Sequence, residues 1–163
     1  MPGALTALEE LGEVATLAIV SNGATQVQES RIAASGIGRF MDGVYISEKW
    51  VRQSFAQAAG LCIRDLGLTN RSRVLMVGDD LLADIKGGIN AGIDTCWVNF
   101  ANEENKTGIQ PKYTVHSYEE LYRVVMEPEE TGKCRRAQPS AYERGLKQTN
   151  GMCAAGVKNC AAA

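Results

Sequence analysis

The feature that most limits how this chain can fold is a regular alternation of short apolar runs with helical segments. Residues 17–20 and 74–77 are continuous apolar runs, and each is followed at once by polar residues. Runs of this length and composition are typical of strands that are buried on both faces of a parallel sheet. Three further runs are expected to add strands to the same sheet: residues 44–46, 95–98 and 113–115.

Segments with helical periodicity separate these strands. In the first of them, Ala4, Leu5, Leu8 and Leu11 share one helix face, and Gly12 ends the helix. The remaining helices are expected over residues 25–34, 55–66, 82–91 and 118–126, the last with Ser117 as its cap and Glu120 at the capping-box position. Strands that alternate with helices of this length predict an α/β fold, a Rossmann-like parallel sheet flanked by helices and joined by right-handed crossovers.

Composition narrows the class of protein further. With 163 residues, 45% of them hydrophobic, the chain suits one globular domain. The longest clean apolar run, residues 14–20, falls far short of the ~20 residues that a membrane helix needs. A net charge of −2 does not suggest a nucleic-acid partner. The five cysteines form no CxxC pair, which favours ordinary thiols in a reducing cytoplasm over a disulfide framework or a metal knuckle.

Charge is unevenly distributed along the chain. Residues 1–132 hold 11 basic and 18 acidic side chains, a net of −7, whereas residues 133–163 hold six basic and one acidic, a net of +5. The second segment also has little aliphatic bulk, so its burial could not offset ~1–2 kcal/mol per residue of ordering entropy. We therefore expect a core domain over residues 1–127 and a disordered basic tail over residues 128–163.

Ligands of open α/β sheets bind outside the carboxyl ends of the strands, which directs attention to the residues that follow each strand. Asp79 and Asp80 come directly after the strand at 74–77, and Asp84 lies within the first turns of the next helix. Mg²⁺ prefers one or two carboxylates together with water and phosphate oxygens. Spacing alone favours such a metal site equally with a second interpretation, in which Asp79 or Asp80 caps the helix.

A hydroxyl-bearing turn follows the strand at 17–20. Ser21, Asn22 and Gly23 precede a helix whose free backbone N–H groups could hold a phosphate together with the Ser21 hydroxyl. The alternative is that Ser21 is an ordinary helix N-cap. Asn99 and Asn102, in the loop after the strand at 95–98, lie at the edge of the same region and could contact a substrate.

Taken together, these turns resemble two motifs of the haloacid dehalogenase (HAD) superfamily of phosphohydrolases. Residues 17–23 are similar to its second motif, and Gly78-Asp79 with Asp84 is similar to its fourth, of the GDxxxxD type. Residues 2–125 resemble the branch that includes pyrimidine 5′-nucleotidases. The resemblance implies that Ser21 and the Asn22 N–H bind phosphate, that Asp79 binds Mg²⁺ and that Asp84 supports it. It also implies an aspartate nucleophile that forms an aspartyl phosphate.

The sequence departs from the family in two places. The first motif, DxDxT, carries the nucleophile and does not occur here, and the cap domain that usually follows it is also absent. In the family this motif ends a strand at the centre of the sheet, between those that end at Ser21 and at Asp79. The third-motif Lys-Pro is replaced by Gln53-Ser54, so Lys49 or Arg52 would have to supply the cation. We therefore expect an incomplete sheet that lacks its first, central strand, with unpaired edges that invite self-association.

Three functions follow from these observations. The first is a Mg²⁺-dependent hydrolase of small phosphate monoesters, such as nucleoside 5′-monophosphates. The second is a non-catalytic HAD-like remnant that binds phosphate or Mg²⁺, and the missing nucleophile favours it for this chain. The third is a signalling or nucleotide-binding module in which the acidic turn has a regulatory role.

Overall fold

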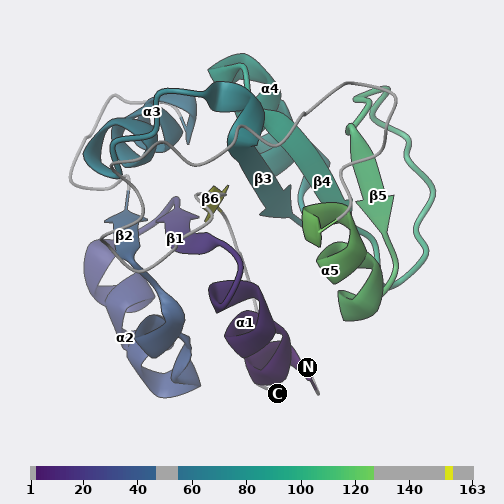
Figure 1. Cartoon of the computed structure of the whole chain (residues 1–163). Coiled ribbons are helices and arrows are strands. Elements are labelled where there is room, and N and C mark those ends of the chain that lie inside the picture. Colours follow the sequence, from purple (N-terminus) through teal and green to yellow (C-terminus); the bar gives the residue numbers. More distant parts are fainter. Residues whose placement is uncertain (1–2, 47–54, 127–152, 156–163) are drawn as a thin grey trace, which may run out of the picture.

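The computed structural model describes residues 3–46, 55–126 and 153–155. These residues form three layers, with a parallel sheet between two layers of helices (Figure 1). The predicted α/β class is therefore confirmed. The helices lie close to their expected positions: α1 Ala4–Gly12, α2 Thr25–Ser35, α3 Phe55–Asp65, α4 Lys86–Ala91 and α5 Tyr118–Met126.

The sheet has the strand order β2-β1-β6-β3-β4-β5, with every neighbouring pair parallel. Five of its strands are those that the sequence predicts: β1 Thr16–Ser21, β2 Gly43–Ile46, β3 Val74–Gly78, β4 Asp94–Val98 and β5 Tyr113–Val115. β1 and β3 are buried over almost their whole length, as continuous apolar runs require.

The sixth strand is the unexpected element. Residues Cys153–Ala155 form β6, which lies between β1 and β3 and pairs with both (Figure 1). The sequence predicts an absent strand at this place. In the structure a short segment from near the C-terminus stands there instead, and its backbone meets hydrogen-bonding groups of β1 and β3 that would otherwise need other partners.

The strand β6 lies within the part of the chain that the sequence predicts to be a disordered tail. The tail predicted to be disordered, residues 128–163, lies outside the described residues apart from Cys153–Ala155. Those three residues are part of the sheet, which differs from the prediction. Composition could not reveal this, because a strand so short gains its place from the two strands beside it rather than from its own apolar content.

Apolar side chains fill both sides of the sheet. On one face, Val20 and Met76 belong to a cluster with residues of α3 and α4. On the other face, Ile19 and Val77 belong to a cluster with residues of α1 and α5. Successive side chains of β1 and β3 therefore point alternately into two apolar cores, one on each face of the sheet. Each layer of helices covers one of these cores.

Local signals explain where several elements begin and end. Gly36 and Gly92, both in the left-handed region with φ of 69°, end α2 and α4. The Ser117 hydroxyl accepts the Glu120 N–H at 3.2 Å, and the Glu120 carboxylate accepts the His116 N–H at 2.7 Å. The predicted cap of α5 is thus confirmed, although the carboxylate reaches one residue further back than in a standard capping box.

One predicted helix differs in kind. Residues 82–91 are expected to form a single helix, but the structure has a π-helical turn, η4 Leu81–Ile85, that leads directly into α4. The Ile85 N–H bonds to the Asp80 carbonyl at 3.2 Å, as a π turn requires. Two 3₁₀ turns, η1 Ile37–Phe40 and η3 Arg71–Arg73, complete the described elements.

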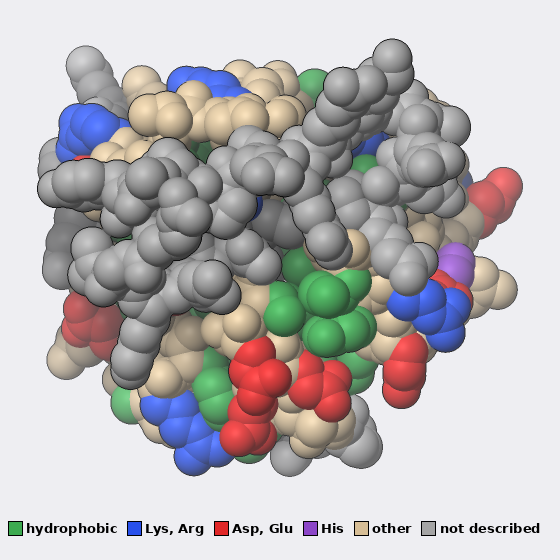
Figure 2. Space-filling view, in the orientation of Figure 1, with side chains coloured by type: hydrophobic (Ala, Val, Ile, Leu, Met, Phe, Trp, Pro, Cys, Tyr) green, Lys and Arg blue, Asp and Glu red, His purple; other side chains and the backbone are tan. Residues whose placement is uncertain are grey.

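Acidic side chains are grouped on one part of the surface (Figure 2). Acidic side chains gather on the lower middle of the face in Figure 2, where α1 lies in Figure 1. Glu9 and Glu10 of this helix are both exposed. None of the described helices is both long and apolar enough to cross a membrane.

Candidate functional site

All strands run in the same direction, so their carboxyl ends meet at one edge of the sheet. Ser21 at the end of β1 stands opposite Ile46 of β2, and Gly78 at the end of β3 stands opposite Trp97 of β4. The two turns that the sequence singles out therefore share this edge. They do not adjoin, because β6 separates β1 from β3 and two strand spacings amount to about 10 Å.

The turn that holds Asp79, Asp80 and Asp84 is called the acidic turn below. Its first two carboxylates have different roles. Asp80 is the N-cap of η4: its Oδ1 accepts the N–H groups of Leu82 at 2.8 Å and Ala83 at 2.9 Å. Asp79 makes no such cap, and its side chain is exposed at the edge of the sheet. Its backbone carbonyl accepts the Trp97 indole N–H at 3.0 Å, which ties the turn to β4. Of the two capping alternatives, the structure thus selects Asp80.

Asp84 lies behind this turn rather than at its surface. The residue is 1% exposed, and its Oδ2 accepts the Asp80 N–H at 3.3 Å. A Cβ atom added to Gly78 would lie 2.7 Å from the Asp84 Cγ, so the carboxylate packs directly on the strand end. Glycine is needed at position 78 because the buried carboxyl group occupies the space that any side chain would take.

The donor set of this turn suits Mg²⁺ better than a transition metal. The described part of the chain holds no cluster of three or more His, Cys, Asp or Glu side chains that could form a closed metal cage. Mg²⁺ does not need one, since one or two carboxylates with water and substrate oxygens satisfy it. Asp79 is the accessible carboxylate, Asp84 is the buried one, and Asp80 is engaged as a helix cap. The residues present therefore fit a Mg²⁺ ion.

The hydroxyl turn is built from the end of β1. Ser21 is 5% exposed and still belongs to the strand, whereas α2 has Ala24 as its N-cap. The structure thus excludes the interpretation of Ser21 as the cap of α2. Gly23 has φ of 139°, a conformation that favours glycine, and an added Cβ would lie 2.9 Å from Nε2 of Gln28. That Nε2 donates to the Asn22 carbonyl at 3.5 Å, which links the turn to the first turn of α2.

The loop after β4 is held by a residue whose part in the fold the sequence does not show. Asn99 is 6% exposed; its Nδ2 donates to the Glu103 carbonyl at 3.0 Å and its Oδ1 accepts the Glu103 N–H at 2.7 Å. Its own carbonyl lies 2.8 Å from Nδ1 of His116. Asn102 adopts a left-handed φ of 56° within the same loop. The side-chain amide of Asn99 therefore holds the loop in shape. The sequence of this one chain carries no local signal for that role.

Other conspicuous residues belong to the core. Trp97 packs with Leu81, Ile85 and Ile109, and Cys62 and Cys96 are buried and form no disulfide. Burial raises the pKa of the Cys96 thiol from 9.0 to about 12, so it stays protonated and is no nucleophile. Two of the predicted site residues, Lys49 and Arg52, lie outside the described residues.

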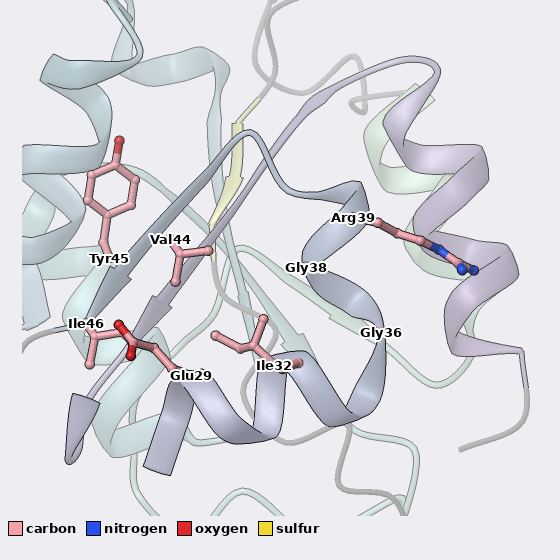
Figure 3. Close-up of a pocket in the computed structure, with 9 residues that line it drawn as sticks. Glu29, Ile32, Gly36, Gly38, Arg39, Val44, Tyr45 and Ile46 are labelled. Atoms are coloured by element: carbon pink, nitrogen blue, oxygen red, sulfur yellow. The ribbon is translucent and has the colours of Figure 1, made fainter. Parts of the chain in front are cut away.

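A pocket opens beside β2, the neighbour of β1 in the sheet. It has a volume of about 610 Å³ and opens between α2, η1 and β2, with an apolar lining to which Ile32, Val44 and Ile46 contribute. Figure 3 shows Glu29 beside Ile46 at one end of the pocket, while the Arg39 side chain points away toward α1. None of the candidate phosphate or metal residues lines it.

Known proteins resemble this chain over the same region. Residues 51–121 match the family model described as HAD-hydrolase-like. The pyrimidine 5′-nucleotidase YjjG of Escherichia coli is 37% identical over 126 residues, which are 77% of this chain and 56% of the relative. The pyrimidine 5′-nucleotidase PynA of Streptococcus pneumoniae is 42% identical over 105 residues, 62% of this chain and 43% of the relative.

Solved structures agree with these matches. The crystal structure of the HAD-hydrolase YfnB from Bacillus subtilis bound to magnesium superposes with a TM-score of 0.70 and 32% identity, covering 77% of this chain and 55% of that one. The chain spans about half the length of the relatives that it matches. The family model, the two nucleotidases and the YfnB structure agree with one another: over the matched residues this chain is similar to the HAD-like hydrolases.

Proposed function

We propose that this chain supplies the phosphate-binding and Mg²⁺-binding part of a phosphatase for small phosphate monoesters, such as nucleoside 5′-monophosphates. The observation that carries the proposal is the acidic turn at the carboxyl edge of the sheet, where Asp79 is exposed and the buried Asp84 accepts the N–H of the adjoining Asp80. The names of the two nucleotidases support the substrate class. The magnesium-bound relative supports the choice of cation.

In this proposal each residue of the two turns has a distinct role. The Ser21 hydroxyl and the Asn22 N–H bind phosphoryl oxygens, while the left-handed Gly23 lets the backbone turn toward the ligand. Asp79 and Asp84 would hold Mg²⁺, and Asp80 keeps the start of η4 in place. The bound ion would neutralise charge on the phosphoryl oxygens. Lys49 or Arg52 would supply a further positive charge.

We further propose that the chain as given does not complete the reaction. Formation of an aspartyl phosphate requires a carboxylate nucleophile at the site, and the sequence holds no DxDxT motif to provide it. The Cys96 thiol cannot replace it, because it is buried and protonated. The chain would then bind phosphate and Mg²⁺ without turnover. We place it in a reducing cytoplasm, which suits Cys62 and Cys96 as buried cysteines that form no disulfide.

Calorimetry of Mg²⁺ binding tests the site separately from the chemistry. Asp79→Asn should abolish binding, whereas Asp65→Asn should leave it unchanged, because Asp65 is an exposed carboxylate that pairs with Arg64 on α3. Equal binding by both variants would refute the metal site.

Hydrolysis of an aryl phosphate and of a pyrimidine monophosphate, with and without Mg²⁺, tests catalysis. We expect no turnover from the folded chain. Turnover that requires both Mg²⁺ and Asp79 would show that another group acts as the nucleophile, and the proposal of an incomplete reaction would then be wrong.

A further inference from the structure

The indole side chain of Trp97 links β4 to the acidic turn. Its N–H donates to the Asp79 carbonyl oxygen at 3.0 Å. Trp97 is 7% exposed and belongs to one apolar cluster with Leu81 and Ile85 of η4, against which Ile109 of the loop after β4 also packs. A single side chain thus holds the start of the turn by a hydrogen bond and packs with the helical turn that follows it.

The bond from Trp97 restrains the backbone of Asp79. A residue has two soft backbone torsions, φ and ψ. On the N-terminal side of Asp79, Gly78 still belongs to β3 and stands opposite Trp97 in the parallel ladder. On the C-terminal side, the direction of the Asp79 carbonyl group depends on ψ, and the indole N–H holds that carbonyl group. The backbone at Asp79 is therefore fixed from both sides, and only the side-chain torsions are left to aim the carboxylate.

The other hydrogen bonds of the acidic turn hold different residues. Asp80 Oδ1 accepts two N–H groups of η4, and Asp84 Oδ2 accepts the Asp80 N–H. These bonds join residues within five positions of one another. The bond from Trp97 instead comes from a neighbouring strand of the sheet, and it reaches the residue whose carboxylate is exposed.

We propose that Trp97 is a positioning residue for the Mg²⁺ site of the acidic turn. The inference rests on the proposed function, because it needs Mg²⁺ at Asp79. Mg²⁺ demands a nearly ideal octahedron of ligands at ~2.0–2.1 Å, so a carboxylate whose backbone can shift binds the ion less tightly. Replacing a residue that orients a metal ligand typically lowers metal affinity by about 10–100-fold. In this role Trp97 acts on the ion through Asp79 and does not contact it.

Trp97→Phe tests the proposal in the full chain. The change removes the N–H donor and keeps an aromatic ring in the cluster, and calorimetry should show Mg²⁺ binding about tenfold weaker. The matched control is Ile109→Ala, which removes packing against the Trp97 cluster but keeps the indole N–H. The Ile109 carbonyl still accepts Nδ2 of Asn105 at 2.7 Å, so this loop stays anchored and the Mg²⁺ affinity should stay within about twofold. A role of Trp97 in packing alone predicts similar losses of affinity in both variants.

A second measurement uses the unchanged chain and does not depend on how a variant folds. The sequence holds two tryptophans, Trp50 and Trp97, so a ¹⁵N-labelled sample gives two indole N–H signals in NMR, which Trp50→Phe assigns. Added Mg²⁺ should shift the Trp97 signal, because a cation on the Asp79 side chain changes the electric field at the carbonyl group that this N–H contacts. The midpoint should agree with the affinity from calorimetry, and Asp79→Asn should remove the shift.

The outcomes separate this inference from the proposed function. Equal Mg²⁺ affinity of Trp97→Phe and the unchanged chain would overturn the inference and leave the Mg²⁺ site standing. So would equal losses in Trp97→Phe and Ile109→Ala, or a Trp97 signal that saturating Mg²⁺ does not move. If the unchanged chain bound no Mg²⁺, or if Asp79→Asn bound it equally well, the Mg²⁺ site itself would be refuted and the inference with it.

Discussion

Replacing Gly88 by alanine should destabilise the protein, whereas the same replacement at Gly60 should stabilise it. Both glycines lie inside helices, Gly60 in α3 and Gly88 in α4, and neither has a positive φ. Their surroundings differ. A Cβ at Gly60 would meet no atom within 4 Å, but at Gly88 it would lie 2.7 Å from Cγ2 of Thr95 and 2.8 Å from Cβ of Met76.

The magnitudes follow from two opposing effects. Alanine is favoured over glycine inside a helix by about 1 kcal/mol, and this gain applies at both positions. At Gly88 the added methyl group must also push into β3 and β4, and overpacking of this kind costs about 1–3 kcal/mol. We therefore expect the free energy of unfolding to rise by about 1 kcal/mol for Gly60→Ala and to fall by up to about 2 kcal/mol for Gly88→Ala.

Urea denaturation followed by circular dichroism measures both values, with the m-value as a check that unfolding remains two-state. In a chain of 163 residues, each kcal/mol should shift the melting temperature by about 2–4 °C. The difference between the variants isolates the steric cost, because the gain in helix propensity cancels. If Gly88→Ala proved as stable as Gly60→Ala, α4 would not lie as close to the sheet as the structure shows.

Three further predictions concern single contacts. Asp80→Ala should lower the free energy of unfolding by about 1 kcal/mol, because the Leu82 and Ala83 N–H groups lose their cap. Asp80→Ser should retain most of that stability, and urea denaturation compares the two variants. Cys96 should resist iodoacetamide at pH 8.5 until the chain unfolds, as mass spectrometry would show. Since its pKa is about 12 in the folded chain and 9.0 ordinarily, stability should also fall as the pH rises from 9 to 12; labelling of folded Cys96 would contradict this. Lys112→Met should lower the free energy of unfolding by less than ~1 kcal/mol at neutral pH, because the 2.7 Å ion pair with Asp94 is partly exposed. The hydrogen bond to Asp94 raises the pKa of Lys112. The unchanged chain should therefore be more stable than Lys112→Met at neutral pH, and this difference in stability should vanish as the pH rises through that pKa. A difference that stays the same at higher pH would argue against the ion pair.

The sequence by itself determined the elements that carry their own local signal. Residues 17–20 and 74–77 specify buried strands because an uninterrupted apolar run fits a strand covered on both faces. Ser117 and Glu120 specify the start of α5 through hydrogen bonds within four residues of each other. The polar turns at Ser21 and Asp79 could be assigned to one sheet edge because strands joined by right-handed crossovers must run in the same direction.

The tertiary structure decided what depends on partners far apart in the chain. Spacing could not tell which of Asp79 and Asp80 caps the helix, since both can reach N–H groups; the Trp97 bond to the Asp79 carbonyl and the two bonds to Asp80 settle it. Nothing in Cys-Ala-Ala predicts a strand. Cys153–Ala155 occupies the centre of the sheet because β1 and β3 stand on either side with backbone groups to pair, a circumstance created by residues more than 70 positions earlier.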